Sequence, residues 1–103
     1  MSVILEFAML PVDKGESLSS YVAKIITMID ERGVDYQLTP MGTIIETDDL
    51  EAALRIVAAA YKELEGDCNR VYATAKLDIR KGGKDRLRRK VESVEQKVGR
   101  KKT

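Results

Sequence analysis

Two acidic side chains interrupt segments that are otherwise apolar or β-prone. Glu6 lies in the run over residues 3–10, and Glu46 lies in the run over residues 43–47. A carboxylate in the middle of a central strand costs free energy unless it is paired or hydrogen-bonded. One interpretation is structural, with Lys76 on a neighbouring strand as the cationic partner. The other is functional, because such a carboxylate accepts from an amino group, faces a cation, or as one of a pair carries out acid/base chemistry.

Four hydroxyl side chains form a second candidate site. Ser17 and Ser19 open a predicted helix, where free backbone N–H groups favour an anion or a polar ligand atom. Thr39 and Thr43 flank a predicted turn, in which Gly42 lets the backbone approach a ligand closely. A structural interpretation stays open as well, since serines cap helices and Pro-Met-Gly forms turns.

The composition excludes most catalytic chemistry. The chain of 103 residues has no histidine and one cysteine, so neither a common zinc site nor a Ser-His or Cys-His pair can form. The stretch Gly82-Gly83-Lys84 lacks the other residues of a phosphate-binding loop. We therefore expect no enzyme activity, no metal and no cofactor, and a buried, unreactive thiol at Cys68.

Charge is distributed unevenly along the chain. Residues 1–79 carry 7 basic and 14 acidic side chains, a net charge of −7, whereas residues 80–103 carry 11 basic and 3 acidic ones, a net charge of +8. This asymmetry indicates either a nucleic-acid-binding tail or attraction between an acidic body and a basic arm. No apolar run approaches the ~18 residues that span a membrane, and no signal-peptide pattern opens the chain, so a cytoplasmic location is expected.

Hydrophobic periodicity predicts four strands and three helices. The strands are expected over residues 3–10, 35–39, 43–47 and 70–79. The first helix is expected between Ser17, its N-cap, and Gly33. The second is expected between Asp48, its N-cap, and Gly66, and the third follows Gly82-Gly83. The predicted apolar stripe of the second helix consists of Leu50, Ala53, Leu54, Val57, Ala58, Tyr61 and Leu64.

The order β-α-β-β-α-β followed by a helix is typical of a ferredoxin-like α+β split sandwich. Right-handed crossovers give an antiparallel sheet in the order 4-1-3-2, with both main helices on one face. Residues 1–81 are predicted to form the ligand-binding domain, and residues 82–103 a basic helix and tail that belong to that domain or make an oligomer contact. The uncovered sheet face is expected to carry Ile4, Ala8 and Leu10, an apolar patch that predicts self-association through the sheet face or edge.

The last predicted helix carries a narrow apolar seam. Leu87, Val91, Val94 and Val98 recur at spacings of 4, 3 and 4, as in a coiled coil. The Lys and Arg side chains around the seam neutralise phosphates, so nucleic-acid binding is one interpretation. The seam, the nearby acidic residues and the lack of aromatic platforms favour another, in which the helix docks on an acidic neighbouring subunit.

Three stretches resemble the thiamine-binding (YkoF-like) protein family, above all its small single-domain archaeal and bacterial members. They are Ser-Leu-Ser-Ser-Tyr-Val at 17–22, Met-Gly-Thr-Ile-Ile-Glu at 41–46, and Arg-Val-Tyr at 70–72 with Lys-Leu-Asp-Ile-Arg at 76–80. The resemblance implies a ferredoxin-like fold, dimers that assemble into homotetramers, and binding of thiamine or its hydroxymethylpyrimidine part in the cytoplasm. It implies no enzyme activity.

The residues and the resemblance together predict one ligand site. A carboxylate suits the cationic thiazolium of thiamine, hydroxyls suit its aminopyrimidine, and Tyr36 or Tyr72 is expected to stack on a ring. The predicted ligand-binding residues are Glu6, Ser17, Ser19, Thr39, Met41, Thr43 and Glu46, of which Ser19, Thr43 and Glu46 are the leading contacts. The alternative function is an oligomeric structural or nucleic-acid-interacting module that uses the basic C-terminal helix.

Overall fold

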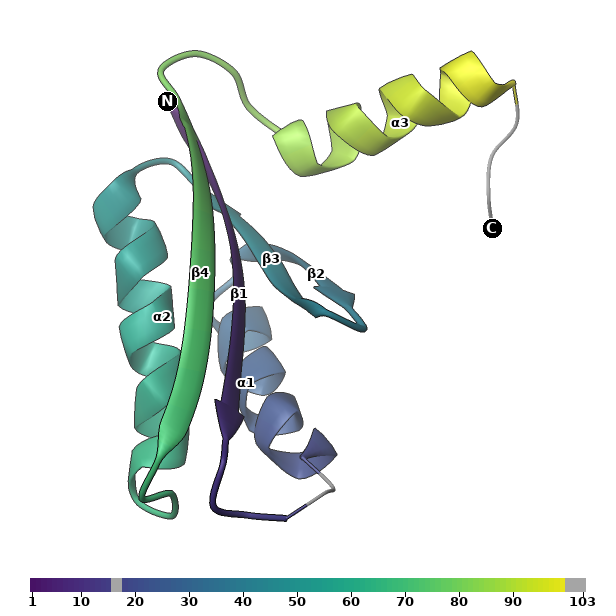
Figure 1. Cartoon of the computed structure of the whole chain (residues 1–103). Coiled ribbons are helices and arrows are strands. Elements are labelled where there is room, and N and C mark those ends of the chain that lie inside the picture. The colour runs from purple at the N-terminus through teal and green to yellow at the C-terminus, as the bar shows by residue number, and fades with distance from the viewer. Residues whose placement is uncertain (16–17, 100–103) are drawn as a thin grey trace.

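Strand β1 (Ser2–Pro11) runs through the middle of the sheet in the computed structural model, which describes residues 1–15 and 18–99. It pairs antiparallel with β3 (Gly42–Thr47) on one side and with β4 (Val71–Arg80) on the other. β2 (Asp35–Thr39) pairs antiparallel with β3, which gives the order β2-β3-β1-β4. Read from the other edge, this is the order 4-1-3-2, so the predicted ferredoxin-like topology is confirmed (Figure 1).

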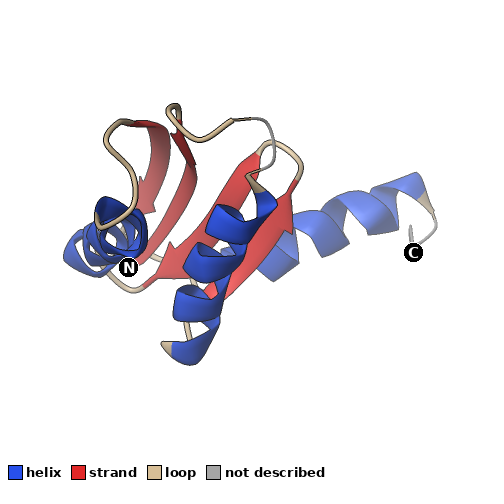
Figure 2. Cartoon of the chain, turned by 90° about the horizontal axis from the view of Figure 1, so that it is seen from below, coloured by secondary structure: helices blue, strands red, loops and turns tan. Residues whose placement is uncertain are grey.

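Three helices complete the described part of the chain: α1 (Ser19–Glu31), α2 (Leu50–Glu65) and α3 (Arg86–Val98). α1 and α2 pack against one face of the sheet, and α3 projects away from the other face (Figures 1 and 2). None of the described helices is long and apolar enough to cross a lipid bilayer.

The side chains of β1 alternate between a covered and an open face of the sheet. On the covered face, Val3, Leu5, Phe7 and Met9 are buried in the core that α1 and α2 close. The open face carries the intervening residues, which are Ile4, Glu6, Ala8 and Leu10. Ile4, Ala8 and Leu10 therefore share the open face as predicted, and self-association through that face stays a prediction. Glu6 belongs to that face, so it stays out of the core although it lies in a central strand.

Helix α1 buries Ile25, Met28 and Ile29. Leu18 occupies its N-cap position and makes no side-chain cap hydrogen bond. Ser17, the predicted N-cap, lies outside the described residues. Gly33 follows the helix with a φ of 70°, a left-handed conformation that glycine adopts without steric penalty, so the predicted end of this helix is confirmed.

Helix α2 differs from its prediction in both cap and buried face. Its N-cap is Asp49 rather than Asp48, and the Asp49 carboxylate accepts a hydrogen bond from the Ala52 N–H at 2.8 Å. The buried face consists of Ala53, Ile56, Ala59, Ala60 and Leu64, whereas Leu50, Leu54, Ala58 and Tyr61 of the predicted stripe are exposed. Two apolar stripes overlap on this helix, and the periodicity of the sequence does not show which of them faces the core. Small side chains let the helix approach the sheet closely, which explains why the alanine-rich stripe faces inward.

Strand β4 is an edge strand, and apart from Val71 its residues are exposed. Its odd-numbered residues lie on the covered face, because they pair with buried residues of β1. They remain poorly covered nonetheless, since Leu77 is 42% exposed and Ile79 is 50% exposed. A long exposed edge strand with apolar side chains favours association with another chain.

Gly42 is expected to be intolerant of alanine. A β-carbon at this position would lie 2.8 Å from the carbonyl oxygen of Phe7 in the neighbouring strand, a contact that only a backbone shift relieves. We expect Gly42→Ala to lower the free energy of unfolding by about 1–2 kcal/mol in urea denaturation. The control is Gly66→Ala, which should leave stability unchanged or slightly raised, because φ there is −70° and nothing lies within 4 Å of the added carbon. Equal stability of Gly42→Ala and the wild type would contradict the close approach.

Candidate functional site

Glu6 lies on the open face of the sheet, opposite Ile44 of β3 and Lys76 of β4 in the register. Its side chain is 39% exposed, and Lys76 Nζ lies 3.9 Å from Glu6 Oε1. The Lys76 side chain is 85% exposed, so this long ion pair is screened by solvent and constrains the lysine weakly. Lys76 is thus confirmed as the partner of Glu6, and the pairing leaves the carboxylate accessible.

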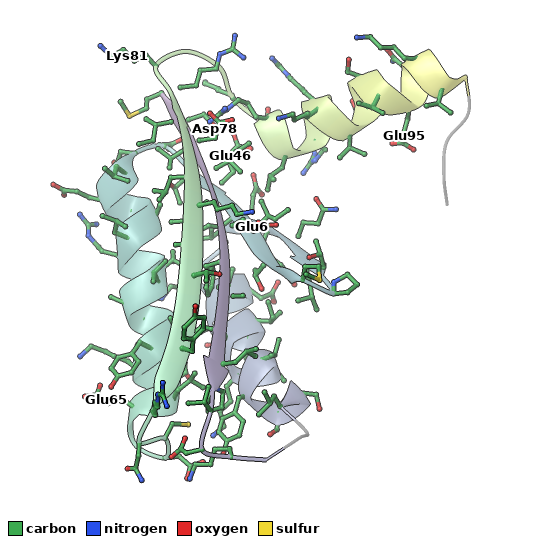
Figure 3. The ribbon with its side chains drawn as sticks, in the orientation of Figure 1. Glu6, Glu46, Glu65, Asp78, Lys81 and Glu95 are labelled. Atoms are coloured by element: carbon green, nitrogen blue, oxygen red, sulfur yellow. The ribbon has the colours of Figure 1, made fainter. Side chains whose placement is uncertain are left out.

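A groove of about 650 Å³ surrounds Glu6 between the open sheet face and α3, a volume typical of small-molecule sites. Its apolar lining includes Ile4 and Ile44 on the open face of the sheet and Leu87, Val91 and Val94 on α3. The polar residues around it include Gln37, Lys76 and Lys90. We call this cavity the Glu6 groove. Figure 3 shows Glu6 on the side of the sheet from which α3 projects.

Glu46 fixes the start of α3. Its Oε2 atom accepts from the Arg86 N–H at 3.1 Å, and its Oε1 atom accepts from the Leu87 N–H at 3.1 Å. These N–H groups belong to the first turn, where a helix has no backbone acceptors of its own. Ser2 Oγ donates a further hydrogen bond to Glu46 Oε2 at 2.5 Å. Asp85 occupies the N-cap position with a φ of 53° and no side-chain cap bond, so a glutamate from β3 replaces the local cap.

The surroundings of Glu46 hold its pKa below the ordinary value. Burial raises the pKa, but the hydrogen bonds from Ser2, Leu87 and Arg86 and the charge of Arg86 lower it by more. Glu46 is therefore an ionised anchor for α3. Its role as a ligand contact stays a prediction, and a ligand would have to compete with three hydrogen bonds.

Arg86 fastens the same end of α3 to the sheet. Its guanidinium donates to Ser2 Oγ at 3.0 Å, to the Ser2 carbonyl at 2.7 Å and to the Asp78 carbonyl at 2.8 Å. Its Nη1 atom also lies 3.0 Å from Asp78 Oδ2. Figure 3 shows Glu46 and Asp78 close to the start of α3. The helix is thus anchored at its first turn, while Val94 and Val98 farther along are exposed.

A smaller cavity of about 330 Å³ lies between β2 and α3. Five carboxylate residues line it: Asp35, Glu46, Asp85, Glu92 and Glu95. We call it the acidic cavity. Tyr36, one of the two predicted stacking residues, lines the acidic cavity, whereas Tyr72 lines neither this cavity nor the Glu6 groove.

The predicted hydroxyl residues of the hairpin serve the fold. Thr39 Oγ1 donates to the Gly42 carbonyl at 2.8 Å and accepts from the Met41 and Gly42 N–H groups at 3.2 and 3.1 Å, so it closes the turn. Thr43 is 6% exposed and pairs with Phe7 on the covered face. Met41 is exposed at the tip of the turn.

The other two predicted hydroxyl residues are Ser17 and Ser19. Ser19 is exposed at the first residue of this helix, and Ser17 lies outside the described residues. Neither Ser19 nor the hairpin residues Thr39, Met41 and Thr43 line the Glu6 groove or the acidic cavity. The structure therefore places Glu6 and Glu46 beside α3, and it places Ser19, Thr39 and Thr43 outside both cavities.

A polar cluster joins the loop after β1 to the loop after α2. Tyr21 Oη donates to Asp67 Oδ2 at 2.6 Å, and Lys14 Nζ lies 3.7 Å from Asp67 Oδ1. The hydrogen bond to Asp67 raises the pKa of Tyr21 to about 12. Cys68 beside this cluster is buried, and its burial raises the pKa of the thiol. The burial of Cys68 agrees with the expectation for this residue.

Sequence reasoning missed the wall that α3 contributes. Leu87 and Val91 were identified only as part of an apolar seam on this helix, and both line the Glu6 groove within this chain. Gln37 was missed as well, although alternation along β2 places it opposite Ile44 on the open face. A carboxylate among apolar walls accepts hydrogen bonds from amino groups and attracts cationic rings. The groove is therefore suited to a small heteroaromatic ligand that carries such groups.

Comparisons with known proteins agree with this description. A family model described as "Thiamine-binding protein" matches residues 5–95 of the chain. The UPF0045 protein of Methanothermobacter thermautotrophicus is 41% identical over 83 residues, which are 80% of this chain and 84% of that protein. UPF0045 protein MJ1052 of Methanocaldococcus jannaschii is 30% identical over 92 residues, which are 89% of this chain and 91% of the relative.

Solved structures show the same architecture. The crystal structure of MJ1052 matches with a TM-score of 0.79 at 30% identity and covers 90% of this chain and 95% of that chain. A structure from Thermotoga maritima, of a protein whose proposed role is thiamine biosynthesis or salvage, matches with a TM-score of 0.77. At 21% identity over 91% of this chain and 99% of that chain, this second match shows the shared fold.

Proposed function

Since the chain belongs to the thiamine-binding protein family, we propose that it binds thiamine or its hydroxymethylpyrimidine part in the Glu6 groove, without catalysing a reaction. The proposed location of this activity is the cytoplasm.

One observation carries the proposal. Glu6 is an accessible carboxylate in a groove with apolar walls from both the sheet and α3, and its cationic partner Lys76 is solvent-exposed and 3.9 Å away. A thiazolium ring can replace the Lys76 ammonium as the counterion, because an opposite charge near a surface carboxylate is attracted without a large desolvation cost. Alternatively, the amino group of the pyrimidine can donate to Glu6. Ile44 and Leu87 supply the apolar contacts that a planar ring requires.

Isothermal calorimetry with thiamine and with hydroxymethylpyrimidine tests the proposal. Saturable heat with either compound, at one site per chain, is the expected outcome. Weak sites of this kind bind in the range from about 1 µM to 1 mM, so the titration has to extend to millimolar ligand. The absence of heat with both compounds at that concentration would overturn the proposed function.

The protein is also proposed to be a homo-oligomer, with a dimer of dimers as the expected form. β4 is a ten-residue edge strand with nine exposed residues, and its covered-face side chains are poorly shielded. Val98 offers a second exposed apolar surface, at the end of α3. The basic charge of α3 complements the acidic charge of residues 1–79, so α3 suits a neighbouring copy of this chain. Two separate surfaces are what a dimer of dimers requires.

Two lysine substitutions separate the proposed interfaces. We expect sedimentation velocity to show a wild-type tetramer, dimers for Ala75→Lys on β4 and for Val98→Lys on α3, and monomers for the double variant. Both positions are exposed and lie outside the Glu6 groove, so folding and the ligand site should persist. Ala23→Lys, at an exposed position of α1, is the matched control and should remain tetrameric. A monomeric wild-type protein would contradict the assembly.

A further inference from the structure

A third groove, of about 560 Å³, opens around the loop between β4 and α3 and concentrates positive charge. Its basic lining residues are Arg80, Lys84, Arg86, Arg89 and Lys90. Its acidic lining residue, Asp78, is paired with Arg86 at 3.0 Å. Within residues 1–15 and 18–99, the other four basic residues form no ion pair. We call this cavity the basic groove.

The backbone of the loop brings two of these arginines together. Gly83 has a φ of 101°, a conformation that favours glycine, and lies between the Arg80 and Arg86 side chains. A β-carbon added there would be 3.8 Å from the Cδ atoms of both arginines. The guanidinium of Arg86 is held by the Ser2 and Asp78 contacts, so one wall of the basic groove is fixed.

The basic groove continues into the Glu6 groove. The two cavities share Ile4, Asp78, Arg86 and Lys90. Ile4 precedes Glu6 by two residues on the same face of β1, a separation of about 7 Å along a strand. A ligand that consists of one ring and a short side chain is therefore long enough to reach from Glu6 to the basic residues.

We infer that the basic groove binds the phosphate group of a phosphate ester whose heteroaromatic ring occupies the Glu6 groove. The inference rests on the proposed function for the identity of the ring, so the ligand is the phosphorylated form of thiamine or of the hydroxymethylpyrimidine alcohol. Each groove binds the part of the ligand whose charge is opposite to its own. Glu6 faces the cationic or amino-bearing ring, and Arg80, Lys84, Arg89 and Lys90 face the phosphate.

The chemistry of a phosphate monoester fits this division. The group carries a charge of about −1.5 to −2 at neutral pH and accepts hydrogen bonds on three oxygens. Arginine side chains recognise such oxygens with two parallel N–H donors, and lysines add mobile charge. An extended nucleic-acid strand fits less well, since the lining of the basic groove includes no aromatic residue for bases to stack on. Residues 1–79, with their net charge of −7, also repel a long polyanion.

Calorimetry with thiamine, thiamine monophosphate and inorganic diphosphate tests the inference. For the wild type in low salt, we expect the monophosphate to bind about tenfold more tightly than thiamine. In the double variant Lys84→Gln/Arg89→Gln this advantage should fall below about threefold, while thiamine affinity stays unchanged. Lys81→Gln/Arg88→Gln is the matched control, because it removes the same two charges, one from the loop before α3 and one from α3, at residues that do not line the basic groove. It should keep the advantage.

The outcomes separate the inference from the proposed function. Thiamine binding without any advantage for the monophosphate, or an advantage that survives in the double variant, overturns the basic groove as a phosphate site and leaves the proposed function standing. Diphosphate binding that the double variant abolishes, together with no binding of thiamine or of hydroxymethylpyrimidine, supports the phosphate site and rejects the proposed function. Binding of single-stranded RNA that neither diphosphate nor the monophosphate displaces rejects the inference in favour of a nucleic-acid surface.

Discussion

Replacing Glu6 with glutamine is expected to weaken thiamine binding by about thirtyfold or more. Opposite charges about 4 Å apart near a protein surface attract by about 4 kcal/mol, and the partial exposure of Glu6 reduces this to about half. Each loss of about 1.4 kcal/mol lowers the affinity tenfold. The substitution keeps the shape of the side chain and removes only its charge. Calorimetric dissociation constants at fixed pH and ionic strength measure the effect.

Two further variants make the Glu6 experiment specific. Lys76→Met removes the cation that competes with the ligand for Glu6, so it should tighten thiamine binding, an effect of opposite sign. Glu65→Gln makes the same chemical change at the exposed C-terminal end of α2, far along the chain from the groove, and should leave affinity unchanged. Equal loss of binding in Glu6→Gln and Glu65→Gln would show that only net charge matters. Unchanged binding in Glu6→Gln would remove Glu6 from the site.

Replacing Glu46 with glutamine should release the start of α3 from the sheet. The Glu46 carboxylate accepts hydrogen bonds from Ser2, Arg86 and Leu87. The side-chain amide of glutamine would present an N–H group to at least one of these three donors, which needs an acceptor. We expect a loss of about 2 kcal/mol in the docking of α3, which is about a thirtyfold rise in its open population. Amide hydrogen exchange at Arg86 and Leu87 reports this change directly. Asp48→Asn, at an exposed neighbour of the same strand end, should not alter exchange at either amide.

Lowering the pH should have the same effect as Glu46→Gln. The folded-state pKa of Glu46 lies below its ordinary value of 4.5, so the carboxylate stabilises docking above that pH. The stabilisation is lost as the pH falls through the lowered folded-state pKa. Protection of the Arg86 and Leu87 amides should therefore fall in acid for the wild type and remain flat for Glu46→Gln. Identical acid profiles for the two proteins would exclude Glu46 as the titrating group.

The local pattern of apolar and polar residues was sufficient to predict the order of the helices and strands and the order of the strands in the sheet. Alternation along residues 3–10 predicted which side chains of β1 leave the core, and the turn at 40–42 joins β2 and β3 as expected. The buried face of α2 could not be predicted, because Leu54 and Tyr61 lie on one apolar stripe and Ala53 and Ala60 on another. The choice depends on how closely the helix can approach the sheet, which a single sequence does not encode locally.

The sequence predicted the carboxylate of the candidate site, but it did not predict the residues that form the walls of the groove. Glu6 stood out because it interrupts an apolar strand, and it lines the groove. The position of α3 depends on hydrogen bonds between Glu46 and backbone groups 40 and 41 residues away, whereas the local residue Asp85 provides no cap. Such a tertiary cap leaves no spacing pattern in the sequence. The position of Arg89 in the basic groove also depends on the placement of α3.

A titration of isotope-labelled protein with thiamine, followed by backbone amide chemical shifts, tests the proposed site most directly. We expect the largest shifts at Ile4, Glu6 and Ile44 on the sheet and at Val91 on α3, which together surround the Glu6 groove. Shifts confined to Ser19, Thr39 and Met41, with none around Glu6, would contradict the account and place the ligand at the hairpin edge instead.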